Sequence, residues 1–433
     1  MKDCIKIGLL GLGTVGGGVF EVLAENAAEI AQKVGAQIRV KTILVRDAKK
    51  KRNVSGDFQV TENIEDILLD DEIDIVIELM GGIHPSREYM LQALSAGKHV
   101  ITANKDVVAQ FGREMFDAAE KHDVDFMFEA SVGGGIPIIR PLKHCLTANK
   151  ITEVIGIVNG TTNYMLTKMT QEGLDYDTVL AEAQSLGYAE SDPTADVEGL
   201  DAARKAAILS SIAFNTRVGL DDVSVEGITK ITPADIEYAK ELGYVIKLLA
   251  IAKDSPENGV DVRVHPAFLP KEHPLAAVND VFNAIFVKGN AVGEVMFYGR
   301  GAGARPTASA VIADVIDVAR DIVNQNFGRV RCTCYEHKAF CPIEKKFSSY
   351  YVRLLVEDQP GVLGSIATTF GAAEVSLNSV IQTRKVDKRA EIVAITHCVT
   401  EEKIRKAAKR LQELSVVTEI RNMIRVENPQ EDD

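Results

Sequence analysis

The sequence is poor in cysteine, lacks long apolar runs and has no excess of positive charge. Six cysteines among 433 residues favour free thiols in a reducing compartment. No stretch approaches the roughly 18 apolar residues of a membrane-spanning helix, and the N-terminus has the pattern of a strand rather than a secretory leader. The 49 basic and 62 acidic residues leave a net charge of −13, which argues against nucleic acid or a membrane as a partner. We therefore expect a cytoplasmic protein.

The length of the chain indicates several domains. A single hydrophobic core rarely grows beyond about 250–300 residues, so 433 residues predict two or three domains. Hydrophobic residues make up 46% and charged residues 26%, which excludes collagen-like and disordered classes. From the patterns described next, we place the domains at residues 1–130, 131–325 and 349–428, with a linker at 326–348.

The first 130 residues alternate short apolar, β-branched runs with segments of helical periodicity. Such runs are typical of strands covered on both faces, and the alternation predicts a doubly wound parallel sheet of the Rossmann type. The expected strands are residues 4–10, 38–44, 73–79, 98–102 and 124–128, and the expected helices are 14–34, 62–69, 85–96 and 106–122.

The remaining residues predict two α+β regions. Residues 131–325 are less regular and suit a catalytic and dimerisation domain, whose last helix we expect to pack back on the first domain. Residues 349–428 predict strand, helix, two strands, helix and strand, which is the βαββαβ order of a ferredoxin-like unit. The patterns in 131–325 predict strands at 151–158, 282–287 and 292–297 and helices at 200–214, 234–252 and 309–323.

A glycine fingerprint follows the first expected strand and opens the first expected helix. In such a turn the first glycine permits a tight bend, the second lets the backbone approach a pyrophosphate, and the third allows close helix packing. The free N–H groups of the helix N-terminus then face the phosphates. The pattern predicts dinucleotide binding at Gly11, Leu12, Gly13, Thr14, Val15 and Gly16.

The end of the second strand bears on the choice of nicotinamide cofactor. An acidic residue there would bind a ribose 2′-hydroxyl, whereas an arginine would favour a 2′-phosphate. The sequence offers both, as Arg46 and Asp47, followed by four basic residues at 49–52. The basic run favours NADP, and NAD stays open.

Two further segments carry lysines that suit proton transfer. Lys105 follows Thr102 at the end of the fourth strand, on the edge where ligands bind in open α/β sheets. Asp201 and Lys205 are four residues apart among small and apolar residues, so they share one face of a helix that we expect to be buried. A lysine beside a carboxylate in such a place can act as an acid or base, although an ordinary salt bridge would show the same spacing.

Two polar segments remain open from their patterns alone. The glycine-rich residues 129–137 could present carbonyl oxygens to a cation or act as a hinge. Cys332, Cys334, His337 and Cys341 are metal-ligand types whose spacing matches no common zinc module, so free thiols in a linker are expected.

Taken together, the motifs resemble those of the monofunctional homoserine dehydrogenase family along essentially the whole chain. The block at 187–205, together with NGTTNY at 159–164, is far more specific than the glycine fingerprint. The C-terminal unit resembles an ACT domain, an amino-acid-sensing module. The matching segments are GLGTVGGG at 11–18, TANK at 102–105, EASVGGGIP at 129–137, GIVNGTTNY at 156–164, GYAESDPTADVEGLDAARK at 187–205 and FYGRGAGARPTA at 297–308.

This resemblance implies an activity and its residues. The family interconverts L-homoserine and L-aspartate 4-semialdehyde with NAD(P), in threonine, methionine and isoleucine biosynthesis. The resemblance also implies feedback by threonine and a homodimer or homotetramer. The resemblance assigns acid/base chemistry to Lys205, with Lys105 as the second candidate, and a sodium site to the Glu129 side chain and the carbonyls of Val132, Gly134 and Ile136.

The resemblance also assigns three sets of binding residues. Those for the substrate are Glu190, Asp201, Gly187, Asn159, Gly160 and Thr161, and those for the cofactor, beside the glycine fingerprint, are Arg46, Thr102, Lys105 and Gly303. Those for the effector are Asp358, Gly361, Val362, Leu363 and Asn378.

Two other functions compete with this reading. A thioester-forming dehydrogenase would need a catalytic cysteine with a histidine partner, and His144 and Cys145 are adjacent residues of an expected helix that point to different faces. A non-catalytic sensor could combine dinucleotide binding with the C-terminal unit. Turnover of homoserine with a nicotinamide cofactor would support the enzyme and exclude the non-catalytic sensor.

Overall fold

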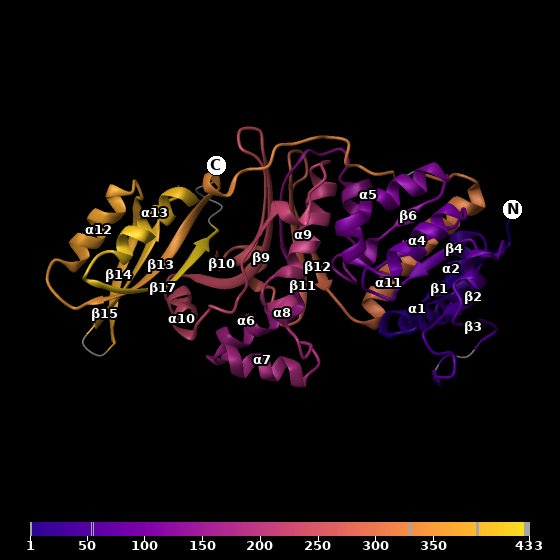
Figure 1. The fold of residues 1–433 in the computed structure, drawn as a ribbon, viewed down its shortest axis with the longest axis horizontal. Helices are drawn as coiled ribbons and strands as arrows, with labels where there is room; N and C mark the ends of the chain where they lie inside the picture. Colours follow the sequence, from indigo (N-terminus) through magenta and orange to yellow (C-terminus); the bar gives the residue numbers. More distant parts are fainter. Residues whose placement is uncertain (1, 53, 55, 329–330, 387–388, 428–433) are drawn as a thin grey trace. The chain divides into compact units, whose positions relative to one another are not determined.

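The computed structural model describes residues 2–52, 54, 56–328, 331–386 and 389–427 (Figure 1). The chain divides into two units. The first contains Met1–Val154, Arg204–Asp222 and Phe282–His337, and the second contains Ile155–Ala203, Val223–Val281 and Lys338–Asp433. Within the described ranges, no helix has both the length and the apolar character needed to cross a membrane.

The first unit is built on a six-stranded parallel sheet, as the alternating pattern predicts. Its order is β3-β2-β1-β4-β5-β6, and every pairing is parallel. The strands β4 and β5 are buried at every position, because helices cover both faces of such a sheet. The strands are β1 (Cys4–Leu10), β2 (Gln37–Leu44), β3 (Gln59–Thr61), β4 (Ile75–Glu78), β5 (His99–Thr102) and β6 (Phe126–Met127).

The helices of the first unit bury aliphatic side chains against this sheet. A helix from late in the chain, α11 (Ala304–Asn324), shares one core with β1 and α1 (Thr14–Glu25), and this core contains Leu9, Val19 and Val311. The other helices are α2 (Ala27–Val34), α3 (Glu65–Leu68), α4 (Ser86–Ser95) and α5 (Lys105–Lys121). A hairpin of β11 (Phe282–Gly289) and β12 (Gly293–Arg300) precedes α11.

The second unit contains strands and helices from three stretches of the chain. The long strands β9 (Tyr244–Ser255) and β10 (Gly259–Pro270) are antiparallel, and β8 (Val223–Val225) runs parallel to β10. Their helices are α6 (Gly160–Glu172), α7 (Tyr176–Ser185), α8 (Thr194–Val197) and α10 (Pro233–Glu241). Two elements, β7 (Ile151–Ile157) and α9 (Leu200–Ala213), carry residues of both units.

The C-terminal part of the second unit has the predicted βαββαβ order. The elements are β13 (Phe347–Glu357), α12 (Val362–Ala372), β14 (Leu377–Val386), β15 (Arg389–Thr396), the short β16 (Val399–Thr400), α13 (Glu401–Gln412) and β17 (Val417–Val426). The sheet order β17-β13-β15-β14 is that of a ferredoxin-like unit, and the helices bury a core of Val352, Ile366, Phe370 and Leu411 against it. Strand β17 also pairs with β10, which joins this sheet to the long hairpin.

The predicted helix at 234–252 is wrong. The helix ends at Glu241, and Gly243 adopts a left-handed conformation with φ of 86° before β9 begins. Seven consecutive residues of β9 are buried, so its apolar residues do not alternate. A continuous apolar run of this kind cannot be distinguished from a buried helix by periodicity.

Two smaller expectations also need correction. The predicted helix at 14–34 is two helices separated at Asn26, whose φ of −105° departs from helical geometry. The predicted helix at 62–69 is reduced to the four residues of α3, preceded by the strand β3 that the sequence analysis missed. Elements of three or four residues, such as β3 and α3, carry too few residues for a periodic pattern.

A buried lysine holds α6 against β9 inside the second unit. The ammonium of Lys247 donates to Asn163 Oδ1 at 3.1 Å, to the Val278 carbonyl at 2.6 Å and to Asn279 Oδ1 at 3.1 Å. Burial lowers the pKa of Lys247 to about 8, because removing the ammonium from water disfavours its charged form.

This lysine should make stability depend on pH in alkaline solution. In the unfolded chain this lysine has the ordinary pKa of 10.5. Between pH 8 and pH 10.5 the unfolded chain therefore binds more protons than the folded protein, so folding stability rises with pH in that window. We expect the free energy of unfolding of the wild type to rise relative to that of Lys247→Met by up to about 3 kcal/mol. Urea unfolding at several pH values measures this difference. Lys240→Met, at an exposed lysine of α10, is the control, and a Lys247→Met curve parallel to the wild-type curve would contradict the prediction.

Candidate functional site

The carboxyl ends of β1 and β4 mark the place in the first unit where a ligand is expected. These strands are neighbours in the sheet. After β1 the chain adds β2 on one side of this pair, and after β4 it adds β5 on the other side, so the strand order reverses between β1 and β4. Ligands of open α/β sheets bind at such a point, outside the carboxyl ends of the strands. The glycine fingerprint follows β1 there, and Lys105 begins α5 directly after the β5 loop.

The glycines of the fingerprint are required by close backbone packing. Gly11 has φ of 97°, and a Cβ at Gly16 would lie 2.3 Å from the Gly11 carbonyl oxygen. A Cβ at Gly18 would lie 2.6 Å from the carbonyl oxygen of Ala304, at the start of α11. By contrast, a Cβ at Gly13 would meet nothing within 4 Å, so the second glycine faces open space.

The start of α1 suits a phosphate group. The helix begins at Thr14 with Gly13 as its N-cap, and no side chain caps it. The first N–H groups of a helix have no partner within the helix, and they carry the positive end of its dipole. The exposed Thr14 and half-buried Leu12 and Val15 complete this turn, and the residues present therefore fit a dinucleotide pyrophosphate.

A buried carboxylate joins the ends of β4 and β5. Glu78 Oε1 accepts the backbone N–H groups of Met80 at 2.8 Å and Gly81 at 3.2 Å, and its Oε2 accepts the Thr102 hydroxyl at 2.7 Å. The Thr102 oxygen in turn accepts the backbone N–H of Asn104 at 2.9 Å. This chain of hydrogen bonds fixes both loops at the sheet edge.

Asn104 then sets the direction of the helix that carries Lys105. Its side-chain oxygen caps α5 by accepting the Val107 N–H at 3.2 Å, and its side-chain nitrogen donates to the Gly82 carbonyl at 2.7 Å. A cap of this kind stabilises a helix start by about 1 kcal/mol. The half-buried Lys105 therefore begins a helix whose first turn is fixed from two sides.

At the end of β2, the two residues that could select the cofactor differ in their contacts. Asp47 Oδ1 accepts the backbone N–H of Lys49 at 2.9 Å, and the Asp47 carbonyl accepts from Arg52 at 2.8 Å. Arg46 is exposed. The carboxylate therefore takes part in its own turn, while the neighbouring guanidinium lies at the surface.

Gly303 is the N-cap of α11, at the start of the helix that packs against α1. It is exposed, its φ is 125°, and its carbonyl accepts the Thr307 N–H at 3.1 Å. A Cβ at this position would lie 3.3 Å from Pro306 Cδ, so both backbone angle and space favour glycine.

The loop after β6 is organised around the buried Glu129. One carboxylate oxygen accepts the N–H groups of Ile138 at 2.6 Å and Ile139 at 2.8 Å, and the other accepts that of Arg140 at 2.7 Å. A carboxylate has about four acceptor positions, so its three bonds to described residues leave one for a cation.

The turn that contains the three predicted carbonyl ligands packs closely on another loop of the same unit. A Cβ at Gly134 would lie 2.3 Å from the Gly301 carbonyl oxygen, and the neighbouring Val132 and Ile136 are buried. No group of three or more His, Cys, Asp or Glu side chains in the described ranges could hold a metal. A cation in this turn would therefore depend on backbone oxygens.

In the second unit, Asn159 brings together two carboxylates from distant positions. Its side-chain oxygen caps α6 by accepting the Thr162 N–H at 2.9 Å. Its side-chain nitrogen donates to Asp196 Oδ1 at 2.7 Å and Asp201 Oδ2 at 2.9 Å. The amide thus holds two acidic groups near one point, which suits a cationic ligand.

The remaining predicted substrate residues surround the start of α6 and the loop after α7. The Thr161 hydroxyl donates to the Tyr188 carbonyl at 2.7 Å, next to Gly187, whose φ is 74°. Gly160 is the first residue of α6. Glu190 is exposed, and its carbonyl accepts from the Gln184 side chain at 3.1 Å.

Asp201 and Lys205 lie one turn apart on α9, as their spacing predicts. Ala202, Ala206 and Ala207 are buried, which confirms that the small residues of this helix face the interior. Asp201 is buried and Lys205 half-buried, so a lysine and a carboxylate share one side of a helix that is otherwise packed.

The predicted effector residues lie around the first βα turn of the C-terminal unit. Gly361 is the N-cap of α12, with φ of 89°, and no side chain caps the helix. Val362 is buried, Leu363 is 43% exposed, and Asp358 and Asn378 are exposed. The turn therefore combines helix N–H groups with an exposed aliphatic side chain.

Three positioning residues escaped the sequence analysis: Glu78, Asn104 and Asp196. Glu78 is the last residue of β4 and follows three apolar residues, Ile75–Ile77, so its carboxylate stands out in the sequence. Asn104 directly precedes a helix, which is a typical capping position. Asp196 lies in the polar segment before α9, but its contact with Asn159 depends on the fold.

Comparisons with known proteins match nearly the full length of the chain. Three family models match: the NAD-binding domain of homoserine dehydrogenase at residues 11–129, homoserine dehydrogenase at 137–316 and the ACT domain at 350–416. The homoserine dehydrogenase of Synechocystis sp. is 48% identical over 98% of this chain and 99% of its own. That of Bacillus subtilis is 43% identical over 98% of each chain.

Solved structures show the same similarity. The crystal structure of a homoserine dehydrogenase from Thiobacillus denitrificans is 43% identical, with a TM-score of 0.94 over 99% of both chains. A mutant hyperthermophilic archaeal homoserine dehydrogenase in complex with NADPH is 28% identical, with a TM-score of 0.64 over 76% of this chain and all of its own.

The glycine geometry predicts a strong effect of one methyl group. In Gly16→Ala the new Cβ would contact the Gly11 carbonyl, so the fingerprint turn must shift. We expect the melting temperature to fall, with a loss of about 1–3 kcal/mol in the free energy of unfolding, and dinucleotide affinity to fall at least about tenfold. Thermal unfolding and fluorescence titration with a reduced nicotinamide dinucleotide measure both.

Gly17→Ala is the matched control for stability. A Cβ at Gly17 meets nothing within 4 Å, and alanine is the better residue inside a helix by about 0.5–1 kcal/mol. Its melting temperature should equal or exceed that of the wild type. Equal stability of Gly16→Ala and Gly17→Ala would contradict the packing argument.

Proposed function

The chain belongs to the homoserine dehydrogenase family, and from this premise we propose how its residues catalyse the reversible, NAD(P)-dependent interconversion of L-homoserine and L-aspartate 4-semialdehyde. This reaction lies on the route to threonine, methionine and isoleucine. One observation carries the proposal. The Asn159 amide donates hydrogen bonds to Asp196 and Asp201, and Lys205 lies one helical turn after Asp201 on α9.

The acidic groups are proposed to bind the substrate ammonium. Glu190 and Asp201 carry the negative charge, Asn159 fixes Asp201, and Asp196 adds a second carboxylate beside the same amide. An ammonium group donates three hydrogen bonds and is stabilised by nearby carboxylates. Gly160 and Thr161, at the start of α6, shape the same part of the second unit.

Lys205 is proposed as the acid/base at the substrate oxygen. When semialdehyde is reduced, negative charge develops on the aldehyde oxygen, and a cationic lysine stabilises that charge and donates the proton. When homoserine is oxidised, the neutral amine accepts the hydroxyl proton. A bound nicotinamide cofactor supplies or accepts the hydride. Lys105 is the second candidate, held by its capped helix after β5.

The cofactor is proposed to be NADP rather than NAD. Asp47 is engaged with the N–H of Lys49, whereas Arg46 is exposed at the same strand end, next to further basic residues. A guanidinium binds a 2′-phosphate in two-point geometry. The archaeal relative in complex with NADPH supports the same choice.

A sodium ion is proposed for the loop after β6. The free acceptor position of the Glu129 carboxylate and the carbonyls of Val132, Gly134 and Ile136 would bind it, since hard cations prefer oxygen ligands. The ion would join the turn at 132–136 to the carboxylate that already holds residues 138–140.

The chain is also proposed to form a homodimer or homotetramer. Strand β12 is the terminal strand in its sheet order and exposes Met296 (41%) and Tyr298 (55%). Apolar side chains on an edge strand suit pairing with another chain.

Removal of the Lys205 ammonium should abolish most turnover. We expect Lys205→Ala to lower kcat at least about 100-fold, with the melting temperature preserved, because the side chain is only half-buried. The measurement is the absorbance of reduced nicotinamide during homoserine oxidation, with NADP and NAD in parallel. Lys121→Ala, at an exposed lysine near the end of α5, is the control. Near-normal kcat in Lys205→Ala, with a large loss in Lys105→Ala, would transfer the role to Lys105.

Threonine is proposed as a feedback inhibitor bound at the α12 turn by Asp358, Gly361, Val362, Leu363 and Asn378. The uncapped helix start suits its carboxylate, and the exposed Leu363 suits its methyl group.

The effector site can be tested with one amide. Asn378→Ala should raise the threonine concentration for half-inhibition at least about tenfold, since a hydrogen bond to a charged group contributes roughly 1.5–3 kcal/mol. Thr368→Ala, at an exposed position later in α12, is the control. If threonine changes neither the activity nor the melting temperature of the wild type, this effector is wrong.

A further inference from the structure

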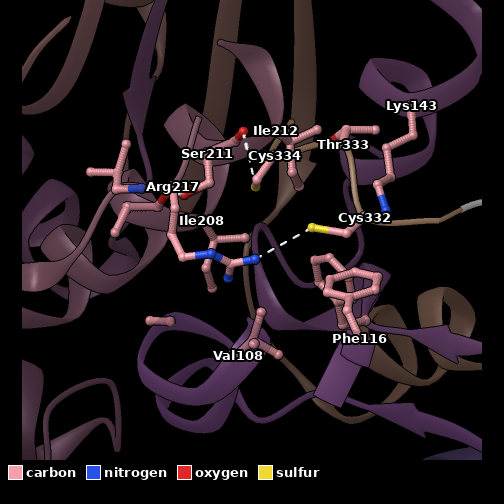
Figure 2. Close-up of a pocket in the computed structure, with 15 residues that line it drawn as sticks. Val108, Phe116, Lys143, Ile208, Ser211, Ile212, Arg217, Cys332, Thr333 and Cys334 are labelled. Atoms are coloured by element: carbon pink, nitrogen blue, oxygen red, sulfur yellow. Dashed lines mark hydrogen bonds between the residues drawn. The ribbon is translucent and has the colours of Figure 1, made fainter. Parts of the chain in front are cut away.

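Two cysteines face a pocket of the first unit that no step of the proposed reaction uses. Cys332 and Cys334 line it together with residues of α5 and α9 (Figure 2). The rest of the lining is apolar except for two cationic side chains, a serine and a threonine. The pocket is bounded by Val108, Ala109, Gly112, Phe116, Phe128, Lys143, Ala207, Ile208, Ser211, Ile212, Arg217, Val218 and Thr333.

The two cations lie close to Cys332. Arg217 Nη2 is 3.4 Å from Cys332 Sγ, and Figure 2 shows the Lys143 side chain on the side of the pocket where Cys332 lies. The Lys143 ammonium lies 4.8 Å from the centre of the Phe116 ring and donates to the Arg331 carbonyl at 3.2 Å. Positive charge beside a thiol stabilises its thiolate.

The neighbouring cysteine also acts on Cys332. Hydrogen bonding from the Cys334 side chain, then from its backbone N–H, and then the charges of Arg217 and Lys143 hold the pKa of Cys332 below its ordinary value, against the opposing effect of burial. The pKa of Cys334 is raised, first by its hydrogen bond to Cys332 and then by burial. These opposite shifts favour a thiolate at Cys332 and a protonated thiol at Cys334.

The backbone holds the cysteine segment in place. The Tyr335 N–H donates to the Thr333 carbonyl at 3.0 Å, which bends the chain at Cys334, and the Cys334 thiol contacts the Ser211 carbonyl at 3.6 Å. The Glu336 N–H donates to the Asn215 carbonyl at 2.8 Å. Residues two apart have Cα atoms within about 7 Å, a separation that a disulfide can span when the chain bends.

We propose that Cys332 and Cys334 form a peroxide-reactive thiol pair, in which Cys332 is the nucleophile and Cys334 resolves the oxidised product into a disulfide. The Cys332 thiolate attacks a peroxide oxygen, so that an S–O bond forms, the O–O bond breaks and the leaving oxygen is released as hydroxide or alkoxide, which takes up a proton. The Cys334 sulfur then attacks Cys332, so that an S–S bond forms, the S–O bond breaks and the thiol proton leaves with the hydroxyl as water. Two thiols are oxidised by two electrons and the peroxide is reduced.

Peptide mapping of the full-length, reduced protein after treatment with hydrogen peroxide tests the pair. Trypsin releases residues 332–338, which contain both cysteines and no other. We expect this peptide to lose two hydrogens and to recover them with dithiothreitol. Cys334→Ser should stop at a sulfenic acid on Cys332 that dimedone traps, and Cys332→Ser should leave Cys334 as a thiol. Cys145→Ser, at an exposed thiol elsewhere, is the control and should oxidise like the wild type.

Two outcomes of this mapping would overturn the proposal. One is a 332–338 peptide that stays reduced while Cys145 or Cys398 is oxidised. The other is Cys334 oxidation in Cys332→Ser at the wild-type rate.

The pH dependence of alkylation tests the role of the cation without removing either cysteine. In the wild type, Cys332 should react with iodoacetamide with a midpoint below the ordinary thiol value of about 8.5. Arg217→Met should move this midpoint up by about one pH unit, because an opposite charge is lost. A midpoint at the ordinary value in the wild type would show that Cys332 is not the nucleophile. A low midpoint that Arg217→Met leaves unchanged would show that the Arg217 guanidinium does not stabilise the thiolate.

Discussion

The architecture of the first unit depends on a carboxylate that has been removed from water. A buried charge is costly unless donors surround it, and Glu78 receives two backbone N–H groups and one hydroxyl. Two of these donors belong to the loop after β4, and the third is Thr102, the last residue of β5. The hydrogen bonds that stabilise the buried carboxylate therefore also fix the shape of the ligand-binding edge. The cap at Asn104 extends this constraint to α5 and therefore to Lys105.

The second unit repeats this principle where its helical part meets the C-terminal sheet. Asp235, in the first turn of α10, forms a capping box with Thr232 and also accepts from Arg353 of β13 at 2.9 Å and from Asn422 of β17 at 2.9 Å. Arg353 also donates to Glu391 of β15 at 2.9 Å. A movement of this sheet would therefore strain α10. If an effector binds at the α12 turn, this network is the physical connection by which its binding energy could reach α10, the helix that precedes β9.

The peroxide-reactive pair and the proposed acid/base residues share their supporting helices. Helix α5 begins at Lys105 and contributes Val108 and Phe116 to the cysteine pocket, and α9 carries Lys205 and contributes Ser211. The contact of Cys334 with the Ser211 carbonyl is therefore only two helical turns from Lys205. A disulfide would turn the Cys334 sulfur toward Cys332. The end of α9 would then lose the contact between the Ser211 carbonyl and the Cys334 thiol.

Local sequence patterns predict the loops that contain the proposed site residues and most of the regular elements. The glycine fingerprint, the parallel sheet and the βαββαβ order follow from local spacing, because steric contacts such as that of Gly16 with Gly11 lie within a few residues. Tertiary structure decided what depends on distant partners. It made residues 244–255 a strand, since pairing with β10 outweighs an ambiguous apolar pattern. It also brought Asp196 to Asn159, Glu78 to Thr102 and Arg217 to Cys332. No local pattern encodes these contacts, because each joins segments separated by 24 to 115 residues.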